Sequence, residues 1–244
     1  MKPKMRTNPL TQVLDLIIPR TCVQCGGPVE ETAYDYVCAR CVQDLYIVRP
    51  PFCDTCGFPF FGVVEKVPAC PRCREMAPRF DAGRTVFLHR GVGSVFVREL
   101  KYRQAMYLLS DIEKCCVQSP GLQRYLEGSV LVPVPLHPRK RRERGFNQST
   151  ALAECFARVG GGLEVVDGLV RRIDTESQTS LDRIHRQSNV KNAFAIAPKA
   201  AFNRSQRYIL IDDVFTTGAT LNACSAQLRK AGVEHLDVLT LAHG

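Results

Sequence analysis

The sequence contains no tryptophan, and its 7 tyrosines and 12 phenylalanines form no obvious stacking ladder. Long apolar runs are missing as well. The longest are residues 13–18, interrupted by Asp15, and residues 130–136, interrupted by two prolines. Both are far shorter than the roughly 20 apolar residues of a membrane-spanning helix. The basic N-terminus has neither a continuous apolar core nor a small-residue cleavage site, so we expect no signal peptide and a cytoplasmic protein.

Cysteine, by contrast, is abundant and regularly spaced. Eight of the 12 cysteines form four Cys-x-x-Cys pairs, with 12 residues between the first two pairs and 13 between the last two. In a reducing compartment such pairs indicate metal ligands rather than disulfides. Two pairs together supply the four thiolates of a tetrahedral zinc site. A redox dithiol normally occurs once, at a strand–helix junction, and four repeats argue against that alternative.

We therefore predict two structural zinc ions, each held by two consecutive pairs. The expected ligand sets are Cys22, Cys25, Cys38 and Cys41 for one ion and Cys53, Cys56, Cys70 and Cys73 for the other. An interleaved pairing stays open as the alternative. The four remaining cysteines are expected in the core.

The formal net charge is +9, and two zinc ions with four thiolates each would lower it to about +5. The surplus lies mainly after residue 100, which favours anionic ligands for that part of the chain.

The composition changes near residue 80, and we predict a double zinc-ribbon module at residues 1–79 and an α/β domain at residues 80–244. In the second part, short apolar stretches alternate with helical patterns, which indicates a parallel sheet covered by helices. Strands are expected near 84–89, 129–135, 164–171, 207–212 and 235–241, and helices near 94–117 (with a break near 101–104), 147–159 and 219–231.

The most specific pattern lies between Tyr208 and Leu221. A run of four apolar residues predicts a buried parallel strand, and Asp212 and Asp213 are expected where it ends. A Thr-Thr-Gly-x-Thr turn then opens a helix, whose unpaired N–H groups suit a phosphate. Gly218 lets the backbone approach closely, and the two acids can bind ribose hydroxyls directly or through hydrated Mg²⁺. The alternative is an ordinary strand end with solvated acids.

Two polar, basic segments follow predicted strands. The first, residues 132–149, has five cations within 139–144, and Arg144 and Gly145 adjoin the start of the next helix. The second is residues 171–194. Solvated surface loops, or a nucleic-acid patch for the first segment, are the alternatives. Lys101 is expected to be a cation on a helix surface.

These segments together resemble type I phosphoribosyltransferases, and residues 208–221 match the family's motif for phosphoribosyl pyrophosphate (PRPP) along its whole length. Residues 132–149 resemble the pyrophosphate loop, and residues 171–194 the flexible loop that closes over PRPP. The resemblance implies the following site: Asp212 and Asp213 as the catalytic acids; Val214, Phe215, Thr216, Thr217, Gly218, Ala219 and Thr220 as the PRPP-binding turn; and His137, Arg144, Gly145, Arg183, Arg186 and Lys191 as pyrophosphate and flexible-loop contacts. Phosphoribosyl transfer passes through an oxocarbenium-like centre, so no serine or cysteine nucleophile is expected.

The cysteine ribbons, the Arg-Arg-x-Arg-Gly-Phe-Asn-Gln segment, the Arg-x-x-Asn-Val-Lys-Asn-Ala-Phe segment and the PRPP motif occur in one order. This combination resembles the ComF family, with its competence-associated and GntX-type members, over about residues 10–243. The resemblance implies a bacterial protein for the uptake or use of external DNA. It also implies zinc, Mg²⁺ with PRPP, and single-stranded DNA and competence-machinery proteins as partners.

Three functions stay open at this point. The first is a DNA-uptake accessory protein that binds PRPP and single-stranded DNA. The second is an active phosphoribosyltransferase for a nucleobase or an amine. The third is a PRPP-sensing regulator on the same fold.

Overall fold

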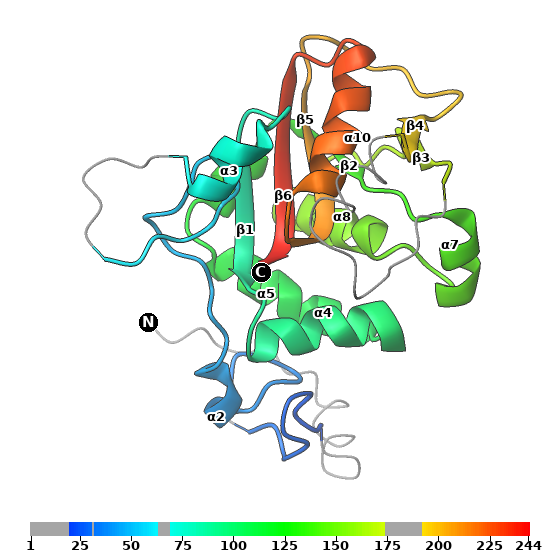
Figure 1. Cartoon of the computed structure of the whole chain (residues 1–244). Helices are drawn as coiled ribbons and strands as arrows, with labels where there is room; N and C mark the ends of the chain where they lie inside the picture. Colours follow the sequence, from blue (N-terminus) through cyan, green and yellow to red (C-terminus); the bar gives the residue numbers. More distant parts are fainter. Residues whose placement is uncertain (1–19, 31, 63–68, 174–191) are drawn as a thin grey trace.

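The computed structural model describes residues 20–30, 32–62, 69–173 and 192–244. Its centre is a parallel sheet in the order β1-β6-β5-β2 (Figure 1). The strands are β1 (Gly83–Leu88), β2 (Ser129–Pro133), β5 (Arg207–Phe215) and β6 (His235–His243). Every residue of β6 after His235 is buried, as expected for an inner strand that is covered on both faces.

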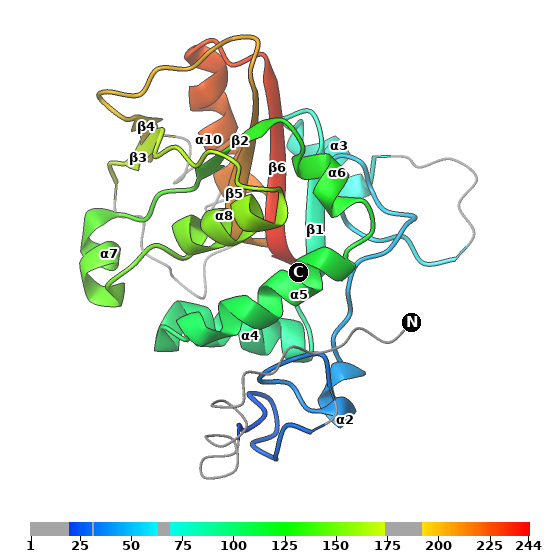
Figure 2. The same ribbon diagram turned by 180° about the vertical axis from the view of Figure 1, so that it is seen from behind.

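Helices cover both faces of the sheet. On one face lie α4 (Val92–Arg103), the 3₁₀ turn η1 (Met106–Leu108), α5 (Leu109–Gln118), α6 (Leu122–Leu126) and α8 (Gln148–Val159) (Figure 2). On the other lies α10 (Ala219–Lys230), beside the antiparallel pair β3 (Leu169–Arg171) and β4 (Phe194–Ile196) (Figure 1). The predicted break after Lys101 is confirmed, because α4 ends at Arg103 and Gln104 adopts a left-handed conformation.

The first cysteine ribbon, which contains α2 (Ala39–Val42), docks on α5. The buried carboxylate of Asp111 accepts hydrogen bonds from the backbone N–H groups of Asp35 (2.6 Å) and Tyr36 (2.8 Å). Lys114 donates to the carboxylate of Asp35 at 2.6 Å and to that of Asp111 at 3.2 Å. A buried acid that receives two main-chain donors fixes the ribbon at this place.

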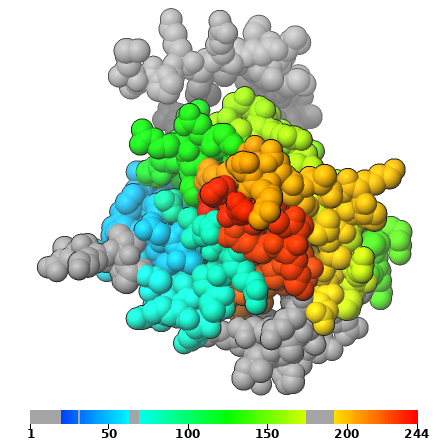
Figure 3. Space-filling view, turned by 90° about the horizontal axis from the view of Figure 1, so that it is seen from above, coloured from blue at the N-terminus to red at the C-terminus, as the bar shows by residue number. Residues whose placement is uncertain are grey.

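The second ribbon, which contains α3 (Pro71–Met76), docks on the edge strand β1 and beside α10. The N–H of Gly83 donates to the Asp54 carbonyl at 2.8 Å. The four cysteines of this ribbon belong to one core cluster with sheet residues such as Leu210 and Val238. In the space-filling view, the cyan segment around α3 lies beside the orange-red segment of α10 (Figure 3). The division that we propose at residues 79/80 therefore separates two parts that share a core.

The structure confirms the predicted class, a parallel α/β domain preceded by a double zinc ribbon, and corrects three local predictions. The strand expected at residues 164–171 is present only as β3, because the chain bridges β2 at Val165 alone and then pairs with β4. The basic loop is a helix, α7 (Pro138–Arg144), which starts with proline at its first position. Strand β5 does not end before the acids but continues to Phe215, which pairs with His243 of β6. No helix within the described ranges is both long and apolar enough to cross a bilayer.

Candidate functional site

The eight paired cysteines form two separate clusters with the predicted membership. Within each set of four, all sulfur atoms lie within 4.8 Å of one another. The Sγ–Sγ distance is 3.7 Å for Cys25 and Cys38 and 3.7 Å for Cys56 and Cys70. Zinc–sulfur bonds of about 2.3 Å in a tetrahedron require about 3.8 Å between sulfur atoms. Both clusters therefore fit zinc, and the consecutive pairing is confirmed over the interleaved one.

A cysteine side chain binds zinc as a thiolate, so its thiol must first lose its proton. Burial alone would raise the pKa of Cys22, but hydrogen bonds from the backbone N–H groups of Cys38, Cys25 and Gln24 lower it to about 7. The main chain thus prepares this thiol for metal binding. The other four cysteines of the chain are buried in the core, as predicted.

The acid pair lies near the carboxyl end of β5, and its two members have different partners. Oδ1 of Asp212 accepts a hydrogen bond from the Ser149 hydroxyl at 3.1 Å and one from the N–H of Asp213 at 2.9 Å. Oδ2 of Asp213 lies 3.2 Å from the ammonium group of Lys101. The pair therefore joins β5 to the first turn of α8 and to the last turn of α4.

The environment sets the protonation of the pair. Burial, and next the charge of Asp213, raise the pKa of Asp212 from 3.8 to about 7, against the opposing effects of Lys101 and Ser149. Burial alone would lower the pKa of Lys101, but the charge and the hydrogen bond of Asp213 raise it. Asp212 is thus poised to release a proton near neutral pH when a cation or a hydroxyl donor arrives.

Lys101 is a residue that sequence reasoning placed wrongly. It is half-buried and forms an ion pair with Asp213, so it is not a solvated surface cation. Its position follows from the end of α4, because the Lys101 carbonyl accepts a hydrogen bond from the Gln148 amide at 3.3 Å. No local sequence signal links residue 101 to residue 213, and only the packing of α4 beside the sheet brings them together.

The turn after β5 has the conformation that the motif predicts. Gly218 has φ +73° and caps α10. A Cβ atom at this position would lie 2.3 Å from the Met76 sulfur and 2.7 Å from the Phe215 ring, so a side chain here would have to displace both. The Thr217 hydroxyl accepts a hydrogen bond from the N–H of Ala219 at 3.3 Å. The turn therefore presents backbone at the start of a 12-residue helix, which is the arrangement that suits a phosphate.

The segment that leads from β2 into α8 places Ser149 next to the acid pair. Asn147 caps α8 by accepting from the N–H of Ser149 (3.2 Å), and its amide donates to the Val134 carbonyl (3.0 Å). These contacts hold Ser149 against Asp212. Sequence reasoning included Asn147 and Ser149 in the basic segment but assigned neither a role. Their signal was the helix-capping pattern that directly follows Gly145.

The predicted pyrophosphate contacts lie on or beside α7. His137 caps this helix by accepting from the N–H of Arg139 at 3.4 Å. Arg144 is half-buried and lies over the Tyr102 ring at 5.7 Å, while Gly145 ends the helix with φ +75° close to the side chain of Gln104. The predicted flexible-loop contacts lie outside the described residues: Arg183, Arg186 and Lys191.

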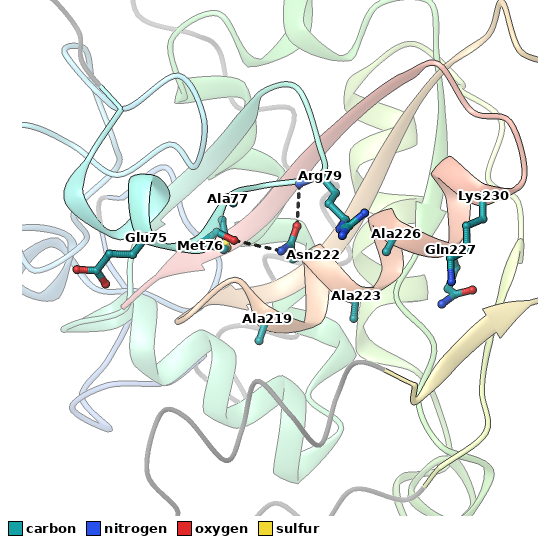
Figure 4. Close-up of a pocket in the computed structure, with 10 residues that line it drawn as sticks. All are labelled: Glu75, Met76, Ala77, Arg79, Ala219, Asn222, Ala223, Ala226, Gln227 and Lys230. Carbon is teal, nitrogen blue, oxygen red and sulfur yellow. Dashed lines mark hydrogen bonds between the residues drawn. The ribbon is translucent and has the colours of Figure 1, made fainter.

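A cavity of about 490 Å³ lies between the second ribbon and α10 (Figure 4). Its floor is formed by small residues of α10 and its rim by polar ones from both elements. The lining residues are Glu75, Met76, Ala77, Arg79, Ala219, Asn222, Ala223, Ala226, Gln227 and Lys230. One end adjoins the turn after β5, because Ala219 follows Gly218 directly.

Sheet, acid pair, glycine-capped helix and cysteine clusters together define the class of the protein: a type I phosphoribosyltransferase-like domain behind a double zinc ribbon. A family model described as "Double zinc ribbon domain" matches residues 13–78. Among characterised proteins, the chain is similar to "Competence protein F" of Haemophilus influenzae, with 28% identity over 91% of this chain and 96% of the relative. It is also similar to "DNA utilization protein YhgH" of Salmonella typhimurium, with 28% identity over 93% and 98%.

A third relative is "Competence protein ComFC" of Streptococcus pneumoniae, with 27% identity over 78% of this chain and 86% of the relative. The resemblance to the ComF family that the motifs indicate is thereby confirmed.

Two solved structures also match part of the chain. A purine phosphoribosyltransferase from Pyrococcus horikoshii matches with a TM-score of 0.35 and 14% identity, over 56% of this chain and 74% of that one. The glutamine PRPP amidotransferase from B. subtilis matches with a TM-score of 0.38 and 16% identity, over 59% and 30%.

Proposed function

We propose that the protein binds PRPP with Mg²⁺ at the carboxyl end of β5, in the cytoplasm, and acts in the use of external DNA. The observation that carries the proposal is the acid pair on β5, which leads within one turn into the glycine-capped start of α10. In this assignment the turn from Thr216 to Thr220 holds the 5-phosphate through main-chain N–H groups and hydroxyls.

The acid pair supports the ribose part of the assignment. Carboxylates at this position accept hydrogen bonds from vicinal ribose hydroxyls, or hold hydrated Mg²⁺ between the sugar and the diphosphate. Lys101 lies at the same site and neutralises part of the acid charge. Arg144 and Gly145, at the end of α7, would face the pyrophosphate, and the basic surplus after residue 100 supports an anionic ligand.

Titration calorimetry with PRPP and Mg²⁺ tests this site. In the double variant Asp212→Ala with Asp213→Ala we expect affinity to fall by about 100-fold or more, because charge-assisted contacts to the sugar and its metal are worth about 3 kcal/mol together. The matched control removes two exposed acids, Glu127→Ala with Glu154→Ala, and should bind as the natural chain does. Equal affinity in both double variants would refute the assignment.

The DNA part of the proposal comes from the relatives, two of which are named as competence proteins and one as a DNA utilization protein. We infer that the chain binds single-stranded DNA through its basic C-terminal part. Binding by phosphate neutralisation weakens steeply as salt rises. A gel-shift series from low to high salt tests this, and binding that is absent or insensitive to salt contradicts it.

Whether PRPP is consumed is a separate question, and one measurement distinguishes the answers. A transferase releases pyrophosphate when the correct nucleobase or amine is supplied. A sensor or accessory protein binds PRPP without releasing pyrophosphate, and its affinity for a protein or DNA partner then depends on PRPP.

A further inference from the structure

The second zinc ribbon touches the phosphate turn directly. Arg72, which lies between the zinc ligands Cys70 and Cys73, donates from Nη1 to the carbonyl of Thr216 at 2.8 Å and to that of Gly244 at 2.5 Å. Thr216 is the first residue of the turn after β5. A guanidinium group that bridges two carbonyls in this way ties the metal knuckle to both C-terminal strands of the sheet.

Met76, the last residue of α3, provides a second contact. Its sulfur occupies the space that a side chain at position 218 would need, at 2.3 Å from the ideal Cβ position. The Asn222 side chain of α10 connects the same region, because its amide donates to the Met76 carbonyl (3.5 Å) and its oxygen accepts from the N–H of Arg79 (2.7 Å) (Figure 4). Residues of α3 thus contact the chain at Thr216, before Gly218, and at Asn222, after it.

An aromatic stack provides a third contact. The His243 ring is stacked on Phe215, the last residue of β5, with 4.9 Å between centroids. The same ring makes an edge contact with Phe58 of the second ribbon, also with 4.9 Å between centroids. The contacts of Arg72, Met76 and Phe58 all come from the second ribbon, in whose described residues the second cysteine set is the only cluster of potential metal ligands.

The first ribbon docks elsewhere, on α5 through Asp111 and Lys114. The two cysteine clusters therefore differ in what their ribbons contact. We propose that the second zinc site is a positioning element of the donor site: zinc there holds α3 so that Arg72 and Met76 fix the Thr216–Gly218 turn for phosphate binding. The first zinc site supports the fold without this link. This inference rests on the proposed binding of PRPP.

Arg72 is the residue to change, because it is not a zinc ligand. In Arg72→Ala we expect both zinc ions to remain and PRPP affinity to fall about 10-fold, within the usual range of coupling between sites. The matched control is Arg74→Ala, which removes an exposed cation from the same helix and should leave affinity unchanged. Arg72→Lys keeps the charge but not the bridging geometry and should lie between the two.

Linkage provides a readout that an effect on general stability would not produce. If zinc at the second site favours PRPP binding, PRPP must retain that zinc by the same factor. A titration with a zinc chelator at equilibrium, followed by absorbance, should therefore show two phases of zinc loss, of which saturating PRPP shifts one to about 10-fold higher chelator. In Arg72→Ala, PRPP should shift neither phase, although both phases of zinc loss remain.

The outcomes separate the two proposals. If the natural chain does not bind PRPP, both the proposed function and this inference fail. If it binds PRPP but Arg72→Ala binds equally well, or PRPP leaves both phases of zinc loss unchanged, the proposed PRPP site is retained. The proposed positioning role of the second zinc site is then wrong.

Discussion

Replacing Gly218 by alanine tests the shape of the phosphate turn, and the chain contains a matched control. Both Gly218 and Gly121 have φ +73° and both cap a helix. A Cβ at Gly218 would meet Met76 and Phe215, whereas a Cβ at Gly121 would meet no atom within 4 Å. The two substitutions therefore share the same backbone strain and differ in the steric clash.

The magnitudes follow from this difference. Left-handed strain in alanine costs about 1–2 kcal/mol at either position. At Gly218 the Met76 side chain can turn away, but Phe215 is only 1% exposed and stacked on His243, so it must shift with the end of β5. Overpacking of this kind adds about 1–3 kcal/mol. We expect a loss of about 1–2 kcal/mol for Gly121→Ala and about 2–5 kcal/mol for Gly218→Ala.

Urea unfolding gives the two free energies, and calorimetry gives the affinity of each variant for PRPP. Gly218→Ala should lose most PRPP binding because the turn moves, while Gly121→Ala should bind normally. An equal loss of stability in both variants would show that the close packing around Gly218 has no energetic role. Normal PRPP binding by Gly218→Ala would show that the turn does not hold the donor.

Three further outcomes follow from the structure. Asp111→Ala leaves two main-chain donors of the first ribbon without their acceptor, so urea unfolding should show a loss of about 3 kcal/mol in the free energy of unfolding. The control, Val117→Ala on the exposed face of the same helix, should change that free energy by less than about 0.5 kcal/mol. The raised pKa of Asp212 implies a contribution to stability that is complete below pH 3.8 and is lost as the pH rises to about 7. The difference in unfolding free energy between the natural chain and Asp212→Asn should therefore decline over this pH window. A difference that stays constant contradicts the raised pKa. Elemental analysis of reduced protein should give about two zinc ions per chain, and a value near zero would mean that the cysteines have another role.

Much of the fold could be predicted because its signals are local. Cys-x-x-Cys spacing defines a metal knuckle within four residues. The apolar run before Asp212, and the threonine–glycine turn after it, define a strand and a helix start without reference to the rest of the chain. Each of these elements lies within a few residues of its predicted position.

The remaining features depend on contacts between distant segments. Lys101 reaches Asp213 only because α4 ends beside the sheet, and Arg72 reaches Thr216 only because the second ribbon folds over β1. The extension of β5 past the acids likewise comes from its pairing with β6, since Asp212 lies opposite Thr240. Propensity and periodicity within a window contain no information on such pairings.

The electrostatics of the acid pair reduce its repulsion of the strongly negative donor that we propose. Two ionised carboxylates at the mouth of the site would repel a sugar diphosphate. Here Lys101 balances Asp213, and a pKa near 7 leaves Asp212 partly protonated at neutral pH. The three groups together therefore carry a charge between zero and about −1. Under the proposed binding of PRPP with Mg²⁺, the charge of the cation would favour ionisation of Asp212, and the cation could replace Lys101 beside Asp213. In the proposed complex the acids would thus be most fully charged when the cation is bound, which would allow a polyanion site to contain adjacent aspartates on one strand.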